Sequence, residues 1–594
     1  MPAKGWSASG GENYTIAENV PEDINKELAE YPEFLRQLLF NRGIETKEKA
    51  EKFLNPSYEE DLHDPFLLLG MDKAVKRILE AVEKGEEIIV YGDYDCDGIP
   101  GSVILHDFFK KIGYENFEVY IPDRHKEGYG LHKHAIEQFS KEDVKLLITV
   151  DLGITNVDEV EFANSLGIDV IITDHHLPGP TLPNAFAILN PKQEGDKYPF
   201  KELCGAGVAF KLVQALIKKI KEDFQLSTFN FQLPAEGWEK WLIDMAGLAT
   251  LSDMVPLRGE NRALAYFGLK VLRRNRRPGL EKLLQNLKIN KYYLTEDDIS
   301  FMINPRLNAA SRMDSPRRAF DLLSTQDESA AGMLADHLTQ INDQRKTLVA
   351  TILRDVKRTL TKRDLSVQAG EKEVIVIGNP KWRLGVLGLV ASRIVEEYGC
   401  PAFVWCKENG CIKGSCRSDG SVNLVEMMRE TKDGTLLDFG GHELAGGFSV
   451  SHDKIHFLED ELIDVYRKTK RETHETNDNL VIDRKLSLDD VTMENYKLIE
   501  KLAPFGMDNP KPIFLFEGVE IAAVKKFGKD KNHLEVSFRK EDGNPVKAIS
   551  FFKQPDSFSV SLEPECRVNL VANLEKNTFH YRTELRLRIV DIFI

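Results

Sequence analysis

The stretch EEIIVYGDYDCDGIPGS, residues 86–102, determines how the rest of the chain is interpreted. Ile88, Ile89 and Val90 form a β-branched run that indicates a buried strand. Three aspartates follow at every second position, so an extended backbone would point their carboxylates the same way: Asp93, Asp95 and Asp97. Crowded like charges repel, and a hard divalent cation would relieve that repulsion. By itself the stretch fits either a metal site or an acidic, solvated loop between strand and helix.

Segments with helix and strand character alternate on both sides of this stretch. Helices are predicted over 72–84, 102–112, 132–139 and 157–166. Strands are predicted over 87–91, 117–121, 145–150 and 168–173. Strands joined by single helices indicate βαβ units and a parallel sheet. The carboxyl ends of parallel strands meet at one edge, where open α/β sheets bind ligands.

Two further clusters of possible metal ligands follow predicted strands. Asp151 ends the strand LLITVD, and Asp174, His175 and His176 end the strand DVIITD. A His-His pair alone is typical of many surfaces and cores, but three clusters at one sheet edge favour metal binding. Carboxylates and imidazole without a thiolate suit Mn²⁺ or Mg²⁺ better than copper or structural zinc. Five or more ligands are too many for one such ion, and two ions about 3.5–4 Å apart are usual in phosphoryl transfer.

Length and composition narrow the class of protein. With 594 residues, 42% hydrophobic and 29% charged, the chain is expected to form three to five globular domains. No apolar run of about 18 residues is present, and the N-terminus has no apolar signal core, so neither a membrane span nor export is expected. Seven cysteines without a CxxC pair argue against a disulfide framework or a zinc site, and indicate a reducing, cytoplasmic location.

The net charge of -16 argues against broad coating of nucleic acid, although an acidic metal site contributes to that total. One local basic cluster fits either a binding patch or a solvated helix end: Arg273, Arg274, Arg276 and Arg277.

The C-terminal half contains signs of a second α/β domain and of a barrel. Residues 318 to about 362 carry helical spacing, which predicts one long connecting helix. A strand at 374–378 begins the second α/β unit, and five short alternating strands after Pro510 indicate a small barrel. Aromatic and basic residues interleave in the barrel, as single-strand binding needs, unless alternate aromatics fill its interior: Phe527, Lys529, Lys531, Phe538, Arg539, Phe551, Phe552 and Lys553.

Four motifs together resemble the DHH phosphoesterase superfamily and, within it, the RecJ family. They are Asp93-Tyr94-Asp95-Cys96-Asp97-Gly98, Asp151-Leu152-Gly153, Asp174-His175-His176 and Ser252-Asp253-Met254-Val255-Pro256. The resemblance runs from about residue 38 to the C-terminus. It implies an α/β fold class: a parallel-sheet DHH catalytic domain, a second α/β DHH-associated domain joined to it by a long helix, and a C-terminal all-β OB-fold barrel. The expected boundaries are a helical lead-in at 1–75, then 76–325, 326–362, 363–470 and 475–594.

The resemblance also implies roles for the metal-site residues. Asp95 would hold one ion, with Asp93 as a further ligand or close support, and Asp151 would bridge both ions. The second ion would be held by Asp97, His175 and Asp253. His176 would face the scissile phosphate, and Asp174 would orient the histidine pair.

Substrate contacts are implied outside the metal motifs. In the loop PDRHKEGYG, Arg124 would contact phosphate and Tyr129 would lie near the bases, unless both are ordinary loop residues. Further candidates come from NPRLNAASRM, GSCRS and GGH: Arg306, Arg312, Ser415, Arg417, Gly440, Gly441 and His442. Lys211 is expected to be structural, 221–240 is expected to be an insertion loop, and Arg383 stands where the family generally has histidine.

Taken together, the resemblance implies a monomeric 5′→3′ exonuclease that uses two Mn²⁺ or Mg²⁺ ions to cut single-stranded DNA into 5′-mononucleotides during repair and recombination. A single-strand-binding protein and a helicase are expected partners. One alternative is a DHH phosphodiesterase acting on cyclic dinucleotides, short oligonucleotides or pAp. Another is a non-enzymatic scaffold, against which the complete set of expected ligands argues.

Overall fold

The computed structural model describes residues 14–222, 234–274, 276–363, 372–408, 410–470, 480–528, 531–577 and 584–594. These residues form two compact units, the first of 60–255 and 259–470 and the second of 14–59, 256–258 and 480–594. None of the described helices is long and apolar enough to cross a membrane. Several predictions fall partly outside the described residues, among them the start of the lead-in, the insertion loop 221–240, the start of the domain at 363–470 and the boundary near 475.

The first lobe of unit one (residues 60–324) is built on a parallel sheet with strand order β3-β2-β4-β5-β6. Its strands are β2 (Glu87–Gly92), β3 (Phe117–Tyr120), β4 (Val144–Val150), β5 (Asp169–Thr173) and β6 (Ala187–Leu189). The register aligns Val90 with Ile148 and Ile148 with Ile171, and all three are fully buried. Burial on both faces explains why these strands are continuous apolar runs. The parallel sheet predicted from the alternating pattern is confirmed.

The crossover helices agree with the prediction except at one end. They are α5 (Met71–Lys84), α6 (Gly98–Lys111), α7 (Lys133–Lys141) and α8 (Val157–Ser165). The predicted helix 102–112 was wrong at its start, because α6 already begins at Gly98. Gly98 and Pro100 look like helix breakers, but proline is tolerated in a first turn, where its missing N–H would have no partner. The aspartate motif is therefore followed immediately by a helix.

A layer of helices completes the first lobe. In chain order, its elements are α4 (Tyr58–Asp61), η1 (Pro65–Leu67), α9 (Gly205–Glu222), η3 (Trp238–Trp241), α10 (Ile243–Ser252), α11 (Gly259–Arg274), α12 (Pro278–Leu287), η4 (Lys291–Tyr293), the π-helix η5 (Asp298–Ile303), α13 (Asn304–Met313) and α14 (Arg317–Ser324).

Ion pairs of two buried cations, Lys211 and Arg277, hold this helical layer together and join it to α6. Lys211 Nζ donates to Glu260 Oε1 at 2.9 Å, in agreement with the structural role expected of this lysine. Arg277 Nε donates to Asp244 Oδ2 at 2.6 Å, and its Nη1 donates to Asp107 Oδ2 at 2.8 Å. Arg277 is therefore an internal residue and not part of a basic surface patch.

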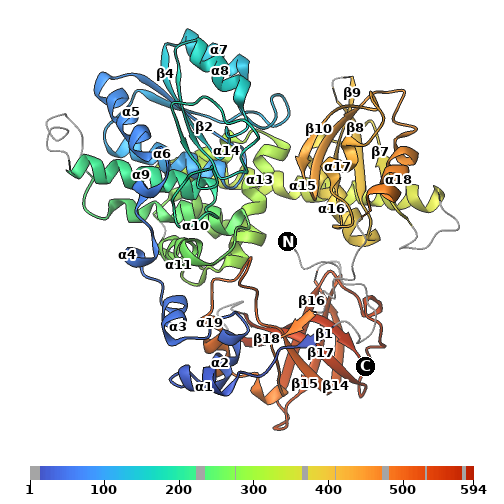
Figure 1. Cartoon of the computed structure of the whole chain (residues 1–594). Coiled ribbons are helices and arrows are strands. Elements are labelled where there is room, and N and C mark those ends of the chain that lie inside the picture. Colours follow the sequence, from blue (N-terminus) through green and yellow to red (C-terminus); the bar gives the residue numbers. More distant parts are fainter. Residues whose placement is uncertain are drawn as a thin grey trace. The chain divides into compact units, whose positions relative to one another are not determined.

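A long helix, α15 (Glu328–Arg363), connects the two lobes of unit one (Figure 1). The connecting helix expected at 326–362 corresponds to α15, but the helical spacing that begins at 318 is divided between two helices, since α14 ends at Ser324 and α15 starts at Glu328. Asp327 explains the restart, because its carboxylate accepts the N–H of Ala330 at 2.7 Å as an N-terminal cap. Near its other end, α15 inserts Ile352 and Val356 into the core of the second lobe.

The second lobe (residues 372–470) is a mixed sheet with strand order β10-β11-β9-β8-β7. Its strands are β7 (Ile375–Gly378), β8 (Ala402–Glu408), β9 (Cys411–Arg417), β10 (Leu436–His442) and β11 (Ala445–Val450). Its helices are η6 (Leu384–Val386), α16 (Leu387–Tyr398), α17 (Leu424–Arg429) and α18 (Leu458–Thr469). The predicted second α/β domain is thereby confirmed.

Unit two contains a closed five-stranded barrel. Its strands are β14 (Phe514–Phe527), β15 (His533–Arg539), β16 (Pro545–Phe551), β17 (Arg567–Asn577) and β18 (Glu584–Phe593). The sheet closes because β14 pairs with both β15 and β17, and β18 pairs with both β16 and β17. Closure removes the unpaired strand edges of an open sheet. The predicted C-terminal barrel is confirmed.

The barrel shares its hydrophobic core with the N-terminal helices. Leu35 and Leu38 of α2 belong to the same core as Phe514 and Phe516 of β14. The remaining elements of this unit are β1 (Tyr14–Ile16), α1 (Glu22–Glu27), α2 (Glu33–Phe40), α3 (Lys47–Leu54), β12 (Leu480–Ile482), β13 (Arg484–Lys485), η7 (Leu488–Asp490), α19 (Met493–Glu500) and η8 (Pro555–Ser557). Residues 14–59 of the expected lead-in therefore pack as part of unit two, whereas residues 60–75 belong to unit one.

Candidate metal centre

The three acidic clusters lie side by side at the carboxyl edge of the first sheet. The ladder of backbone hydrogen bonds continues past the strand ends: Asp93 N–H donates to Val150 O at 3.1 Å and Asp151 N–H to Thr173 O at 2.9 Å. Asp174 N–H donates to Leu189 O at 3.1 Å. Since β2, β4 and β5 are neighbours in the sheet, this register puts the three aspartates in one row.

Possible metal-ligand atoms gather in three overlapping groups of three residues. Within each group the ligand atoms lie within 4.8 Å of one another. The groups are Asp93, Asp95 and Asp151; Asp97, His175 and Asp253; and Asp151, His175 and His176. Asp151 belongs to two groups and His175 to two, so the arrangement can hold two ions that share a ligand. Every residue proposed as a metal ligand from the sequence occurs in at least one group.

Backbone N–H groups orient several of these carboxylates. Asp97 accepts two hydrogen bonds at the start of α9, from Gly205 N to Oδ2 at 2.6 Å and from Ala206 N to Oδ1 at 2.7 Å. A helix N-terminus favours negative charge. Gly205 is required here, because a Cβ on it would lie 2.5 Å from Asp151 Cβ. Gly205 was not among the site residues predicted from the sequence, although the Gly-Ala-Gly run that opens α9 could have indicated a close backbone approach there.

Asp174 holds the histidine pair. Its Oδ1 lies 2.8 Å from His176 Nδ1 and accepts the N–H of His175 at 2.7 Å, while its Oδ2 accepts the N–H of Ile154 at 3.0 Å. Burial alone would raise the pKa of Asp174, but these interactions lower it overall. The same contact raises the pKa of His176 against the effect of its burial. A fixed carboxylate thus favours the imidazolium form of His176.

The remaining acids carry unfavourable charge. Burial and neighbouring carboxylates raise the pKa of Asp97 to about 6 and that of Asp253 to about 9, and raise those of Asp93 and Asp151 well above the usual range. Among the described residues, the buried atoms Asp93 Oδ1 and Asp151 Oδ1 have no hydrogen-bond partner. Divalent cations would supply the missing partner and the missing charge. The residues present therefore fit a metal centre.

Tyr129 contacts the centre from the loop 122–130. Its hydroxyl donates to Asp151 O at 3.2 Å and lies 3.3 Å from His176 Nδ1. Asp151 has a left-handed backbone (φ 64°), a conformation that aspartate adopts more often than most residues with a side chain, and its carbonyl accepts this hydrogen bond. With 46% of its surface exposed, the ring of Tyr129 is also open to a ligand.

An arginine pocket, formed by Arg124, Arg312, Ser415 and Arg417, lies beside the centre. Arg124 lies over the ring of Tyr94, 4.9 Å from its centroid. Ser415 and Arg417 share one face of β9, and a Cβ on Gly388 of α16 would lie 3.2 Å from Ser415 Oγ and 3.0 Å from Arg417 Nη2.

The arginine pocket has an excess of positive charge. Burial and the charges of Arg124, Arg345 and Arg417 lower the pKa of Arg312 to about 9. Arg312 Nη1 donates to the backbone oxygen of Gly385, which does not neutralise its charge. Converging guanidinium groups and a hydroxyl form a site suited to a phosphate group.

The second lobe also reaches the centre through the hairpin of β10 and β11. The ring of His442 is stacked on that of His176, with centroids 6.3 Å apart and planes at 5°. Gly440 and Gly441 precede it on the exposed edge strand. Arg383, which replaces the family's usual histidine, donates to Met313 O at 2.6 Å and thus links the two lobes.

Arg306 is separate from the pocket residues. It is buried and donates to Met302 O at 2.6 Å within the preceding π-helical turn. Its positive charge contributes to lowering the pKa of Arg345 of α15, a residue that the sequence reading did not select. This geometry favours a role in packing α13 against α15.

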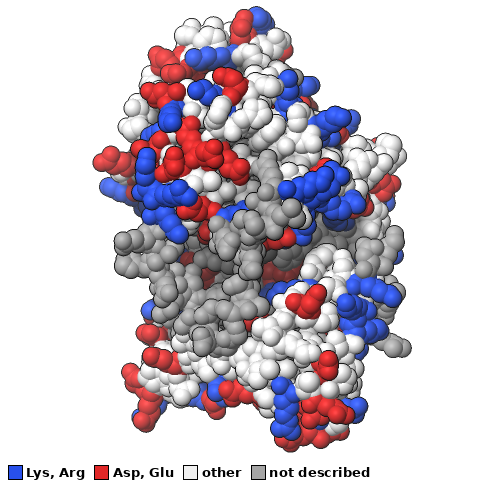
Figure 2. Space-filling model, turned by 90° about the vertical axis from the view of Figure 1, so that its right-hand side faces the viewer, with Lys and Arg blue, Asp and Glu red and all other residues white. Residues whose placement is uncertain are grey.

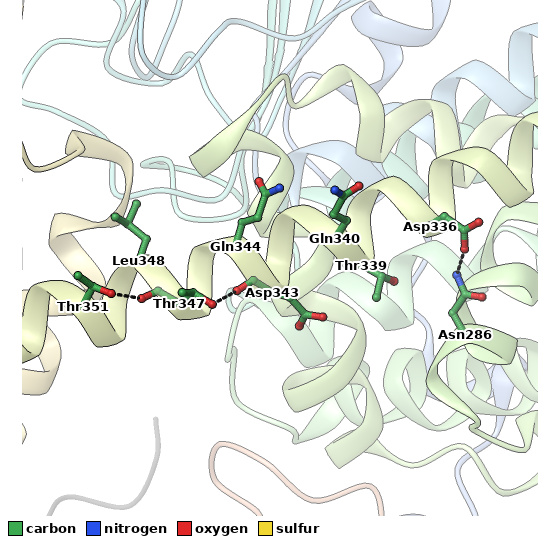
Figure 3. Close-up of a pocket in the computed structure, with 9 residues that line it drawn as sticks. All are labelled: Asn286, Asp336, Thr339, Gln340, Asp343, Gln344, Thr347, Leu348 and Thr351. Atoms are coloured by element: carbon green, nitrogen blue, oxygen red, sulfur yellow. Dashed lines mark hydrogen bonds between the residues drawn. The ribbon is translucent and has the colours of Figure 1, made fainter. Parts of the chain in front are cut away.

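A separate polar groove of about 910 Å³ runs along α15 (Figure 3). Its lining residues are Asn286, Asp336, Thr339, Gln340, Asp343, Gln344, Thr347, Leu348 and Thr351. The lining includes two carboxylates and neither lysine nor arginine, so it is a poor phosphate site.

On the molecular face drawn in Figure 2, basic and acidic side chains form small separate patches.

The barrel carries a cluster of aromatic rings at its surface. His533 lies 5.0 Å from Phe551 and 4.8 Å from Phe552 between ring centroids, and Phe552 is 78% exposed. Arg588 covers Phe551 at 4.0 Å. Phe538, one of the aromatics considered for binding, is instead fully buried in the core. Lys529 lies outside the described residues.

Comparisons with known proteins agree in all three parts of the chain. The DHH family N-terminal domain matches residues 87–233, the DHHA1 domain matches 371–468 and the RecJ OB domain matches 482–591. The single-stranded-DNA-specific exonuclease RecJ of Bacillus subtilis is 36% identical over 93% of this chain and 67% of its own length. RecJ of Escherichia coli is 31% identical over 95% of this chain and 96% of its own length.

Solved structures give the same result. The crystal structure of RecJ from Thermus thermophilus in complex with Mn²⁺ matches with a TM-score of 0.77 and 27% identity, covering 98% of this chain and 79% of that one. A manganese-bound exonuclease RecJ matches with a TM-score of 0.59 and 32% identity, covering 69% of this chain and 98% of that one.

Proposed function

This chain belongs to the RecJ family of DHH phosphoesterases, and from that premise we propose that it is a metal-dependent exonuclease that degrades single-stranded DNA from the 5′ end. One observation carries the proposal: the ligand groups Asp93-Asp95-Asp151 and Asp97-His175-Asp253 adjoin, with Asp151 Oδ1 3.2 Å from His175 Nε2, and the arginine pocket lies beside them. The metal centre can hold a reacting phosphate, and the arginine pocket can hold a strand end.

The proposed ions are Mn²⁺ or Mg²⁺, as in the solved RecJ structures. Asp93, Asp95 and Asp151 would hold one, and Asp97, His175 and Asp253 would hold the other, with Asp151 shared. The donor atoms are carboxylate oxygens and imidazole nitrogens, without a thiolate, and this supports the choice of metal. When bound, the ions would activate water for in-line attack and neutralise charge on the phosphate.

His176 is proposed to stabilise negative charge that develops on the reacting phosphate. Its Nδ1 is held by Asp174, which leaves Nε2 to donate to a phosphate oxygen. The raised pKa of His176 supports the protonated form that such donation needs. Gly440, Gly441 and His442 are proposed to contact the substrate strand from the second lobe, and the ring stacking of His442 on His176 supports this.

The arginine pocket is proposed to bind the 5′-terminal phosphate and so to set the polarity. A metal centre alone would cut any phosphodiester bond that reaches it. A pocket that holds the end would stop the strand one nucleotide beyond the scissile bond and release 5′-mononucleotides. Residues of both lobes contribute to the pocket. This supports binding of a single strand between the lobes and steric exclusion of a duplex.

The barrel is proposed to hold the more distant part of the strand. The exposed ring of Phe552, its partly buried neighbours His533 and Phe551, and the charge of Arg588 support stacking on bases. We further propose that the enzyme acts as a monomer in the cytoplasm with a single-strand-binding protein and a helicase. All seven cysteines lie within the described residues and none forms a disulfide, which supports a reducing compartment.

A small-molecule phosphodiesterase of the same superfamily is the second candidate. The match of residues 482–591 to the RecJ OB domain argues against it, because cyclic dinucleotides or pAp would not need a strand-binding barrel.

A gel assay with 5′-labelled and 3′-labelled single strands, with and without Mn²⁺, tests the proposal. We expect immediate release of labelled mononucleotide from the 5′ label, a ladder of shortening products from the 3′ label, and no reaction without metal. Release of mononucleotide from the 3′ label first would contradict the proposed polarity, and full activity in EDTA would contradict the metal centre.

A further inference from the structure

Asp253 differs from the other acids of the metal centre in how it is held. Asp95 and Asp97 each accept two backbone N–H groups, whereas no hydrogen bond from a described residue reaches the Asp253 carboxylate. Even so, Asp253 Oδ2 lies 3.7 Å from His175 Nε2, at metal-ligand spacing. The position of the backbone at the end of α10 therefore determines where this carboxylate lies.

Asn304 connects the end of α10 to the aspartate motif. Ser252, the residue before Asp253, has its Oγ 2.8 Å from Asn304 Oδ1. The backbone oxygen of Asn304 accepts the thiol of Cys96 at 3.6 Å, and Cys96 stands between Asp95 and Asp97. One buried residue thus contacts both segments that must approach each other for the ligands to meet.

The contact with Ser252 does not depend on how the amide is oriented. The Ser252 hydroxyl also lies 2.6 Å from Leu248 O, and its single proton can go to only one of these acceptors. If it goes to Leu248, the amide of Asn304 can turn and donate to Ser252 Oγ at the same separation.

The local helix geometry explains how Asn304 reaches both segments. Residues 298–303 form a π-helix, and α13 begins at Asn304 with Pro305 next to it. Pro305 has no N–H, so a regular α-helical ladder cannot pass through this point. Widened π-turns are frequent at functional sites because they displace a side chain from its α-helical position.

We infer that Asn304 is a positioning residue that fixes the separation between the aspartate motif and Asp253, and thereby builds the site of the second ion. Its contacts are with Ser252 and Cys96, so the proposed effect on the ion is exerted through these neighbours. This inference rests on the proposed two-metal function and adds to it the residue on which the Asp97, His175 and Asp253 group depends.

Mn²⁺ titration calorimetry on the full chain without DNA tests this. In Asn304→Ala we expect the second ion to bind about 10- to 100-fold more weakly, with the first ion unchanged. Ser252→Ala removes the hydroxyl that contacts Asn304, with little risk to folding, and should lower the affinity for the second ion by a similar factor. In the double variant the loss should match that of a single variant, because both remove one interaction.

Asn116→Ala is the matched control, since it removes an amide bonded to Gly85 O at the surface, and it should leave both affinities unchanged. A folded Asn304→Ala that binds both ions as the wild type does, or losses that add in the double variant, would overturn the inference alone. A wild type that binds fewer than two ions would overturn the two-metal proposal, and this inference with it.

Discussion

The metal centre and the arginine pocket are adjacent but are built in different ways. The metal centre takes most of its residues from the ends of neighbouring strands, where the backbone ladder fixes Asp93, Asp151 and Asp174 in a row. The arginine pocket combines Arg124 and Arg312 of the first lobe with Arg417 of the second. The difference supports the proposed division of roles, in which the acidic site would perform the chemistry and the cationic pocket would select the strand end.

The largest effect is expected from Asp151→Ala. Losing the shared carboxylate should release both ions and lower kcat at least ~10³-fold, or about 4 kcal/mol, in single-turnover assays on single-stranded DNA. Asp158→Ala, an exposed acid of α8, is the control and should retain activity. Full turnover by Asp151→Ala at ordinary Mn²⁺ concentration would mean that the two ion sites do not depend on this residue.

Arg417→Ala tests the other half of the comparison. A lost charged contact costs ~1.5–3 kcal/mol, so kcat/KM should fall roughly 10- to 150-fold on 5′-phosphorylated strands and remain unchanged on 5′-hydroxyl strands. Arg429→Ala, an exposed arginine of α17 in the same lobe, should affect neither substrate. Equal losses on both substrates would show that the pocket does not recognise the end.

Gly205→Ala should damage the acidic site without changing end recognition. The new Cβ would meet Asp151 at 2.5 Å, so we expect roughly 10- to 100-fold weaker Mn²⁺ binding with the preference for a 5′-phosphate retained. Gly207→Ala is a control in the same helix, because its Cβ would have ordinary contacts of 3.5 Å or more. Unchanged Mn²⁺ affinity in Gly205→Ala would argue against the tight packing around Asp151.

Phe552→Ala should have the smallest effect and should change neither chemistry nor end recognition. Base stacking contributes ~1–3 kcal/mol per base, so binding of long single strands should weaken at least about 5-fold in a fluorescence anisotropy assay. Cleavage of strands too short to reach the barrel should be unaffected. Phe457→Ala, which removes an exposed ring of the second lobe, is the control. If Phe552→Ala binds long strands as tightly as the wild type does, the barrel has another role.

The same contrast explains what the sequence could predict. The ligands of the first sheet follow their strands directly, so strand order alone brings Asp93, Asp151 and Asp174 together. Ser415 and Arg417 were found because alternate residues of a strand share a face. That Arg312 could lie beside them was a hypothesis from the chemistry of phosphate binding, since no local pattern joins positions that far apart in the chain.

Contacts made only by tertiary packing were not predictable from the sequence. Gly205, the hydroxyl bond of Tyr129 to Asp151 and the contacts of Asn304 depend on segments that meet only in the folded chain. Alternating hydrophobicity located the barrel strands but did not tell that Phe538 points inward while Phe552 points outward. The amphipathic helix α2 likewise did not indicate that it packs into the core of the barrel.

The central claim is that two ions bind at the strand ends and share Asp151. Crystals soaked in Mn²⁺, with anomalous diffraction recorded near the manganese edge, would test it most directly. We expect two anomalous peaks about 3.5–4 Å apart, one beside Asp93 and Asp95, the other beside Asp97, His175 and Asp253, with Asp151 contacting both. A single peak, or peaks away from these residues, would contradict the account.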